Sequence, residues 1–248
     1  MSQRFLRMAR DTTSVDGILP PLNEEWLANP AEFDEAFTGR TSSADVFLGN
    51  PLYVYQTRIP NLEIIPGEGD GLRRVEMVTQ EQVVQQVHNR MRDFLRAPEI
   101  EETWDLVVID TSPSKGPLTM SAIRAATDVL IPTSMEPQGV EGLQGMLSML
   151  TYENRLRDAS DLINLIGILP NKFRRGVALH EGLLQSLTND PVTGTLMIPH
   201  KLGQRTAFAE ADHESAEPKS VLDLSEKDAA RIEAEDVINF VMKKLGFA

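Results

Sequence analysis

An acidic side chain ends a short apolar run in the middle of the sequence. In the stretch WDLVVIDTSPSKG, residues 104–116, Asp110 directly follows Leu-Val-Val-Ile, and Thr111 and a Ser-Pro-Ser turn come next. An apolar run of this length bounded by turn residues is typical of a buried strand. A carboxylate at the end of such a strand either caps it or belongs to a ligand site, because ligands gather at the carboxyl ends of parallel strands.

Basic residues are concentrated in the last third of the chain. Residues 171–205 contain only two acids and five lysines and arginines: Lys172, Arg174, Arg175, Lys201 and Arg205. The formal net charge of −13 argues against a protein that coats nucleic acid with its whole surface, because phosphate binding needs local positive potential. The five residues predict local, salt-dependent contacts with DNA phosphates; the alternative is a solvated rim that balances the acids of residues 210–236.

Other kinds of catalytic site find little support. The four histidines (His88, His180, His200 and His213) lack the spacing of metal ligands, and no Ser/His/Asp arrangement or carboxylate pair stands out. The absence of cysteine excludes disulfides and thiolate zinc sites. Metal-hydrolase chemistry is therefore not expected.

Strands and helices alternate regularly from about residue 59. Apolar runs predict strands at 61–67, 105–110, 128–134, 162–171 and 195–200, and helical spacing predicts helices at 75–95, 118–126, 140–156, 179–187 and 225–245. This pattern indicates an α/β fold with a mainly parallel sheet flanked by helices on both faces. Asp110 and Asn171 each end a strand of that sheet.

The first 58 residues differ in composition. They are rich in Pro, Asn and acids, and they predict a helix around residues 30–37, capped by Asn29, without an assignable strand of the main sheet. We therefore expect an irregular, partly helical N-terminal segment at residues 1–58 and an α/β domain at residues 59–248.

Nothing in the sequence is typical of a membrane or secreted protein. The apolar runs are far shorter than the roughly 20 residues that span a bilayer, and the start MSQRFLRMARDTTS lacks the apolar region of a signal peptide. The last helix has an apolar stripe of Phe240, Val241, Leu245 and Phe247, and such a stripe is more often packed core than membrane anchor. A cytoplasmic protein without a membrane partner is expected.

From about residue 61 onward the chain resembles the ParA/MinD group of deviant Walker ATPases, and ParA-type plasmid and chromosome partition proteins above all. The segments that carry the resemblance are WDLVVIDTSPSKGPLTMSAIRAATDVLIPTSMEPQGVEGLQGML, IGILPNKF and IPHKLGQRTAFAEA. Their order and spacing make the resemblance specific, and it covers about three quarters of the chain. It implies a P-loop NTPase-like fold.

The resemblance also implies roles for particular residues. Asp110, at the Walker B position, would hold magnesium and position water around the γ-phosphate of ATP, Thr111 would line the nucleotide, and Asn171 would lie near the adenine. The five basic residues would contact DNA non-specifically. The implied assembly is a nucleoid-associated homodimer that is stimulated by a centromere-binding, ParB-like partner.

The sequence departs from the family at the phosphate-binding loop. No G-x-x-x-x-G-K-[ST] motif occurs; the nearest string, FTGRTSS at residues 37–43, has Arg40 where lysine is needed, and Ser112 stands where the family usually has Pro. The N-terminal βαβ unit is therefore expected to be missing, either from a truncated ATPase or from a relative without a P-loop. Since the missing first strand is central in the family, two strand edges would be unpaired unless residues 1–58 or another chain fill the gap.

Two functions follow from these observations. The first is a ParA-like partition protein, in which ATP hydrolysis switches dimerisation and DNA affinity. The second is a nucleotide-free pseudo-ATPase that acts as an interaction or regulatory module. Salt-dependent DNA binding distinguishes the two.

Overall fold

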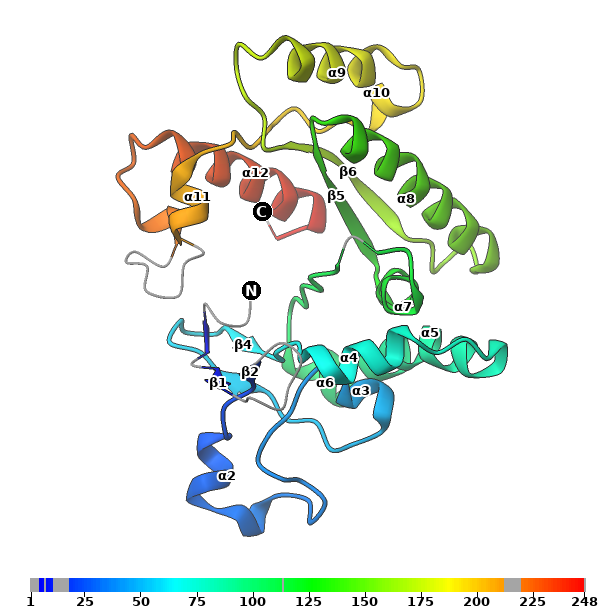
Figure 1. Ribbon diagram of the computed structural model, residues 1–248, viewed down its shortest axis with the longest axis vertical. Coiled ribbons are helices and arrows are strands. Elements are labelled where there is room, and N and C mark those ends of the chain that lie inside the picture. Colours follow the sequence, from blue (N-terminus) through cyan, green and yellow to red (C-terminus); the bar gives the residue numbers. More distant parts are fainter. Residues whose placement is uncertain (1–4, 7, 11–17, 113, 212–219, 248) are drawn as a thin grey trace. The chain divides into compact units, whose positions relative to one another are not determined.

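The structure, a computed structural model, describes residues 5–6, 8–10, 18–112, 114–211 and 220–247 (Figure 1). The chain forms two compact units, residues 1–125 and 126–248. The expected α/β class is confirmed, because helices alternate with strands and the longest strand pair is parallel. The division expected between residues 58 and 59 stays a prediction.

Among its described residues, the N-terminal part of the first unit contains short antiparallel strand pairs and short helical segments. β1 (Ala9–Arg10) pairs with β2 (Ile18–Leu19), and β3 (Tyr55–Gln56) pairs with β4 (Glu63–Ile64). The helical segments are α2 (Glu24–Ala28), η1 (Pro30–Glu32) and α3 (Asp45–Leu48).

The helix expected at residues 30–37 is wrong beyond its first turn. Only the 3-10 turn Pro30–Glu32 forms, and the Asn29 side chain gives it no capping hydrogen bond. Aromatic packing explains the early end: Phe33 and Phe37 pack against each other and against Tyr53, with ring centroids 4.5–5.6 Å apart. These contacts direct the chain into an irregular loop.

Four helices form the second part of this unit: α4 (Gly69–Glu76), α5 (Glu81–Leu95), α6 (Pro98–Thr103) and α7 (Pro117–Ala125). The single helix expected at residues 75–95 is two helices with a break at residues 77–80. The apolar spacing continued through the break and concealed it. α7 forms almost as expected and is tied to α5 by the Ser121 hydroxyl, which donates to the Val87 carbonyl at 2.9 Å.

The strand expected at residues 105–110 does not form. This segment pairs with no described residue of its unit, and the side chains of Leu106, Val107 and Val108 are 44%, 46% and 79% exposed. A strand is defined by its hydrogen-bonded neighbour, so apolar composition alone could not produce one here.

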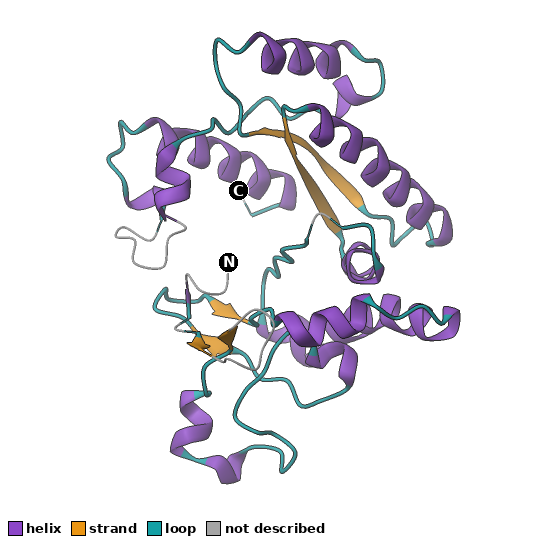
Figure 2. Cartoon of the chain, in the orientation of Figure 1, coloured by secondary structure: helices purple, strands orange, loops and turns teal. Residues whose placement is uncertain are grey.

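The second unit is built on two parallel strands. β5 (Asp128–Ser134) and β6 (Asn164–Asn171) pair from Asp128 opposite Asn164 to Ser134 opposite Asn171, with a register shift at Ile166 that interrupts the ladder. The long helix α8 (Pro137–Leu156) and the C-terminal helix α12 (Ala229–Leu245) flank this pair on opposite sides (Figures 1 and 2). The remaining helical segments are α9 (Ala178–Asn189), α10 (Thr193–Leu196), α11 (Thr206–Ala211) and η2 (Val221–Asp223).

The last expected strand, residues 195–200, is replaced by the short helix α10 and a single bridge. The Asp190 carboxylate accepts hydrogen bonds from the Val192 and Thr193 amides at 2.9 and 2.7 Å, which starts a helical turn where the sequence predicts a strand. Only Met197 then forms a parallel bridge with Ile168, and the Ile198 amide donates to the Ile168 carbonyl at 3.0 Å.

The C-terminal helix packs on the sheet as the core interpretation predicts. Val237 is buried with Leu169 and Ile198, and Phe240 and Val241 pack against the same cluster. Phe247, beyond the end of the helix, is 49% exposed. Among the described helices, none combines the length and the hydropathy needed to cross a bilayer.

Candidate functional site

The turn after Asp110 is held by a glutamate from another helix. Asp110 and Thr111 are exposed. Glu76, the last residue of α4, accepts a hydrogen bond from the Ser114 hydroxyl at 3.0 Å and from the Leu118 amide at 3.2 Å. One carboxylate therefore joins the turn to the first turn of α7.

Gly116 lies so close to the Glu76 carboxylate that this position leaves no room for a side chain. A Cβ atom at Gly116 would lie 1.7 Å from Glu76 Oε1, far inside van der Waals contact. The Ser114 hydroxyl also lies 3.0 Å from the Ser112 hydroxyl and 3.3 Å from that of the buried Thr119. Sequence analysis did not identify Glu76, because it lies 38 residues before Ser114 inside an expected continuous helix.

The string FTGRTSS forms a closed turn. The Thr41 amide donates to the Tyr55 hydroxyl at 3.0 Å, the Ser42 amide to Asp45 Oδ2 at 2.7 Å and the Ser43 amide to the Pro66 carbonyl at 2.8 Å. The Arg40 guanidinium donates to the Pro20 carbonyl. A phosphate cradle needs free backbone amides and a nearby cation, so this string does not fit a nucleotide phosphate.

Asn171 occupies the carboxyl end of β6 in the second unit. Its Oδ1 accepts a hydrogen bond from the Lys172 amide at 2.8 Å, and Lys172 has a left-handed backbone with φ of 52°. This local bond is the strand-end role weighed in the sequence. The side-chain nitrogen of Asn171, Nδ2, has no hydrogen-bond partner among the described residues, so it is available to an acceptor such as a base edge.

Two loops meet beyond Asn171 and place the basic residues on one edge. The Phe173 amide donates to the Leu202 carbonyl at 3.0 Å, and the Gln204 amide donates to the Phe173 carbonyl at 2.9 Å. The Arg174 amide donates to Nδ1 of the buried His180 at 3.2 Å. The predicted basic residues from 172–175 and from 201–205 are thereby brought together.

The five basic residues are not electrostatically equivalent. Arg205 forms a two-point ion pair with Glu233 of α12, with Nε–Oε2 at 2.9 Å and Nη2–Oε1 at 2.5 Å. Arg174 Nε donates to the side-chain oxygen of Gln204. Lys172, Arg175 and Lys201, in contrast, form no ion pair within the part of the chain that the structure describes.

Glu233 has an electrostatic role that the sequence did not reveal. Burial raises the pKa of this carboxyl, but hydrogen bonds from Arg205 and the Gly203 amide, with the charges of Arg205 and Lys201, lower the pKa below its usual value overall. The hydrogen bond with Glu233 raises the pKa of Arg205. The charge of Arg205 is thus largely balanced.

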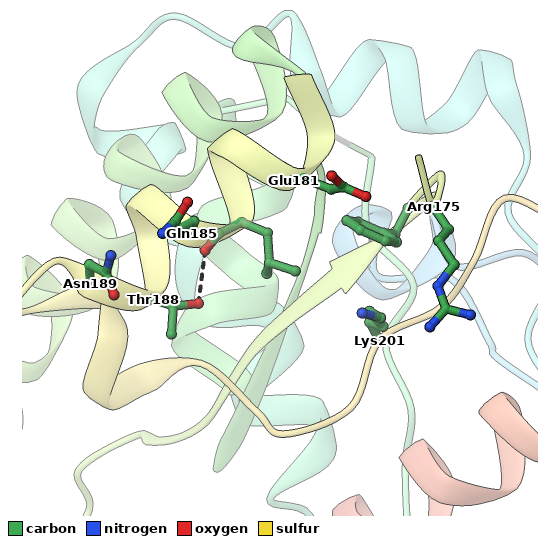
Figure 3. A pocket seen from close by; sticks show the side chains of 8 residues that line it. Arg175, Glu181, Gln185, Thr188, Asn189 and Lys201 are labelled. Carbon is green, nitrogen blue, oxygen red and sulfur yellow. Dashed lines mark hydrogen bonds between the residues drawn. The ribbon is translucent and has the colours of Figure 1, made fainter. Parts of the chain in front are cut away.

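A pocket lies between the edge of this loop pair and α9 (Figure 3). Lys201 Nζ is 4.5 Å from the ring centroid of Phe173, and Arg175 lines the same pocket (Figure 3). The pocket is also lined by Phe173 and by five residues of α9: Glu181, Leu184, Gln185, Thr188 and Asn189. Two cations beside an aromatic ring can contact a phosphate of an elongated ligand.

Comparison with known proteins agrees with this architecture. An AAA domain family (AAA_31) matches residues 50–160. The cell division protein PomZ of Myxococcus xanthus is 28% identical over 185 residues, which cover 73% of this chain and 54% of PomZ. The chromosome partitioning protein ParA of Caulobacter vibrioides is 30% identical over 145 residues, covering 57% of this chain and 52% of ParA.

Solved structures show the same fold. The apo form of Cyanothece McdA superimposes with a TM-score of 0.58 at 18% identity, covering 71% of this chain and 69% of McdA. A plasmid partition protein from Borrelia burgdorferi gives a TM-score of 0.51 at 18% identity, covering 77% and 66%. The expected resemblance to ParA-type partition ATPases is confirmed.

The ParA-like chain spans about half the length of the curated relatives that it matches. Solved structures with this fold include a McdA–ATP complex and a Borrelia partition protein bound to AMPPNP. In the ParA-like chain, Asp110 and Thr111 supply a carboxylate and a hydroxyl that suit magnesium, but residues 37–43 do not fit the phosphates.

His88, His180 and His200 do not converge on a metal site, and no cluster of three or more metal-binding side chains occurs in the described residues. His213 lies outside them. Glu76 and Glu233, by contrast, are structural partners that only the folded chain brings to the turn after Asp110 and to the basic edge.

Proposed function

We propose that this chain is a ParA-like partition protein that binds DNA non-specifically through the basic edge of its second unit. The supporting observation is the placement of Lys172, Arg175 and Lys201 on two hydrogen-bonded loops, without an ion pair to any described acid. Arg174 and Arg205 complete the edge, although hydrogen bonds and the Glu233 ion pair reduce their availability. The kinship with ParA and PomZ supports the same role.

Further elements of this proposal follow from the kinship alone. The protein acts in the cytoplasm on the nucleoid, assembles as a homodimer, and responds to a ParB-like, centromere-binding partner. Asp110, with Thr111, holds magnesium of a bound nucleotide, and Asn171 contacts the base, provided that phosphate-binding groups beyond residues 37–43 are supplied.

DNA binding is tested by fluorescence anisotropy with a labelled duplex of arbitrary sequence over a range of salt concentrations. Three phosphate contacts predict a slope of log affinity against log salt of about −2.7, which is about a 40-fold loss between 50 and 200 mM salt. Removing two contacts in the double variant Arg175→Gln/Lys201→Gln reduces the slope by about 2 and weakens binding at low salt.

A double variant with the same change of net charge is the control. Lys227 and Lys243 are exposed on other parts of the same unit, so Lys227→Gln/Lys243→Gln should retain the wild-type salt slope. Equal losses in both double variants would show that only net charge matters, and a wild-type chain without measurable DNA affinity at 50 mM salt would exclude the proposal.

A second function, a nucleotide-free interaction module, is favoured by the closed turn at residues 37–43. There the Thr41, Ser42 and Ser43 amides all have internal acceptors. Calorimetry with magnesium and ATP distinguishes the two: absence of binding together with absence of DNA affinity supports the module. Tight nucleotide binding that is lost in Asp110→Asn supports the ATPase kinship.

A further inference from the structure

Three N–H donors of the second unit converge on one carboxylate. Glu233 Oε2 accepts hydrogen bonds from the Gly203 amide and from Arg205 Nε, both at 2.9 Å, and Glu233 Oε1 accepts one from Arg205 Nη2 at 2.5 Å. A guanidinium fork of this kind matches the geometry of carboxylates and of phosphates alike. Gly203 and Arg205 therefore form an anion site, and the side chain of Glu233 occupies it in this structure.

The loop that carries these donors is held by contacts that do not involve Glu233. Gly203 forms a parallel bridge with Phe173, in which the Phe173 amide donates to the Leu202 carbonyl at 3.0 Å and the Gln204 amide donates to the Phe173 carbonyl at 2.9 Å. These bonds leave the Gly203 amide free to donate to Glu233. The anion site should therefore keep its shape when the carboxylate is removed.

The anion site continues the basic edge. Lys201 lies two residues before Gly203, and the bridge with Phe173 joins this loop to the one that carries Lys172 and Arg175. A DNA strand presents phosphates at short, regular intervals. A strand bound at the basic edge therefore offers a further phosphate to the Arg205 guanidinium, and Glu233 competes with that phosphate.

A second acid near the site has a different partner. The pKa of Arg205 is raised mainly by its hydrogen bond with Glu233, and further by the charges of Glu233 and Asp228. Asp228, however, caps α12, because its Oδ1 accepts a hydrogen bond from the Ala230 amide at 2.7 Å. Asp228 should therefore not replace Glu233 in the anion site.

We propose that Glu233 is an intramolecular competitor of DNA phosphate, which occupies the anion site of Gly203 and Arg205 and thereby lowers the affinity of the basic edge for DNA. This inference rests on the proposed DNA-binding function and adds regulation to it. The side chains of Arg205 and Glu233 are 38% and 24% exposed, and a pair this open to solvent contributes at most about fivefold to an equilibrium constant. A phosphate therefore competes effectively, and a movement of α12 that withdraws Glu233 would raise DNA affinity.

The test compares Glu233→Gln with Glu235→Gln by fluorescence anisotropy with the same labelled duplex. Glutamine keeps an oxygen for the Gly203 amide but loses the charge that holds Arg205. The matched control makes the same change of charge two residues further along α12, also in an ion pair, since Glu235 Oε1 accepts from Arg231 Nε at 2.7 Å.

The salt dependence reports how many phosphates are bound. Glu233→Gln should steepen the slope of log affinity against log salt from about −2.7 to about −3.6, because one further phosphate is contacted. Its affinity at 50 mM salt should rise by up to about fivefold. Glu235→Gln should retain the wild-type slope. The double variant Arg205→Gln/Glu233→Gln should lose the gain, because the additional contact comes from Arg205.

Nuclear magnetic resonance follows the site directly. The Arg205 Nε–H signal, assigned by its loss in Arg205→Gln, should move in the free chain when Glu233 is replaced by Gln. In Glu233→Gln the signal should move again when DNA is added. A response to inorganic phosphate but not to DNA at the same ionic strength would indicate a free-phosphate site and overturn the inference. Urea midpoints at pH 7 show which variants are folded, and Glu233→Ser is the second variant with the same expected gain.

The outcomes separate this inference from the DNA-binding function. If the wild-type chain binds DNA and the variants Glu233→Gln and Glu235→Gln have equal slopes and affinities, the inference is wrong and the function stands. A gain that persists in Arg205→Gln/Glu233→Gln would also overturn the inference. Failure of the wild-type chain and of every variant to bind DNA at 50 mM salt would exclude both. DNA binding by Glu233→Gln but not by Glu235→Gln or the wild-type chain would support the inference.

Discussion

The Glu76 carboxylate bridges the Ser114 hydroxyl, at 3.0 Å, and the Leu118 amide, at 3.2 Å. The two oxygens of one side chain thus hold both the turn after Asp110 and the first turn of α7 in place. This relationship gives Glu76 control over the position of the turn without contact to Asp110 itself.

Removing the Glu76 carboxylate should therefore destabilise the first unit. Glu76→Ala leaves the Ser114 hydroxyl and the Leu118 amide without their acceptor, and the expected loss is about 1–3 kcal/mol in the free energy of unfolding. Urea denaturation measures it. Glu102→Gln, an exposed position on α6, is the control and should change stability by less than about 0.5 kcal/mol.

Gly116→Ala should act through the same contact. The new methyl group would meet Glu76 Oε1 at 1.7 Å, so the carboxylate must move and its two hydrogen bonds weaken. In a double-mutant cycle the cost of Gly116→Ala should be clearly smaller in the Glu76→Ala background. Equal costs in both backgrounds would show that backbone strain, and not Glu76, makes this position sensitive.

Gly167 of β6 is a second position that leaves no room for a side chain, because residues 196–198 pass directly over it. Gly167 has φ of 151°, and a Cβ there would lie 2.4 Å from Ile198 Cγ2 and 2.9 Å from the Leu196 carbonyl oxygen. Gly167→Ala should therefore destabilise the second unit by about 2 kcal/mol or more. Gly142→Ala, in α8 with open space around it, should instead stabilise by about 0.5–1 kcal/mol; thermal unfolding compares the two.

The ion pair between Arg205 and Glu233 predicts a dependence of stability on pH. Hydrogen bonds from Arg205 and the Gly203 amide lower the pKa of Glu233 in the folded chain from its ordinary value of 4.5. Its contribution to stability is therefore complete above pH 4.5 and is lost as the pH falls through the folded-state pKa. The stability difference between wild type and Glu233→Gln, from urea midpoints, should be constant from pH 7 to 5.5 and shrink below pH 4.5. A difference that grows in acid would contradict the assignment.

Mutations of a buried ion pair at the C-terminal end of α8 should destabilise the protein more than mutations of this partly exposed pair. The side chains of Glu153 and Arg157 are 3% and 1% exposed and 3.5 Å apart, and Arg157 Nη1 donates to the Ala126 and Asp161 carbonyls at 3.1 Å. Glu153→Ala or Arg157→Ala should each cost about 3–5 kcal/mol, because one charge remains buried alone. The double variant Glu153→Leu/Arg157→Met should cost clearly less than the sum of the two, measured by urea denaturation.

Local sequence predicts the elements well wherever apolar spacing and nearby contacts agree. β5 at residues 128–134 was predicted residue for residue, and α7, α8, α9 and β6 differ from their predicted limits by only a few residues. Predictions were wrong where a distant or competing contact determined the local secondary structure. Asp190 started a helix at residues 193–196, aromatic packing ended the turn at Glu32, and residues 105–110 found no strand partner among the described residues.

Local patterns in the sequence are sufficient to predict the α/β alternation, the resemblance to ParA-type proteins and the polar residues that end β5 and β6, because apolar periodicity and strand-end chemistry are local properties of the chain. Which of the charged side chains are free to bind a ligand depends on the fold. It paired Arg205 with Glu233, 28 residues away, and left Lys172, Arg175 and Lys201 without described ion-pair partners. It also joined Glu76 to Ser114 across 38 residues. Ion pairing and hydrogen bonding depend on distances in space, and those distances exist only once the chain has folded.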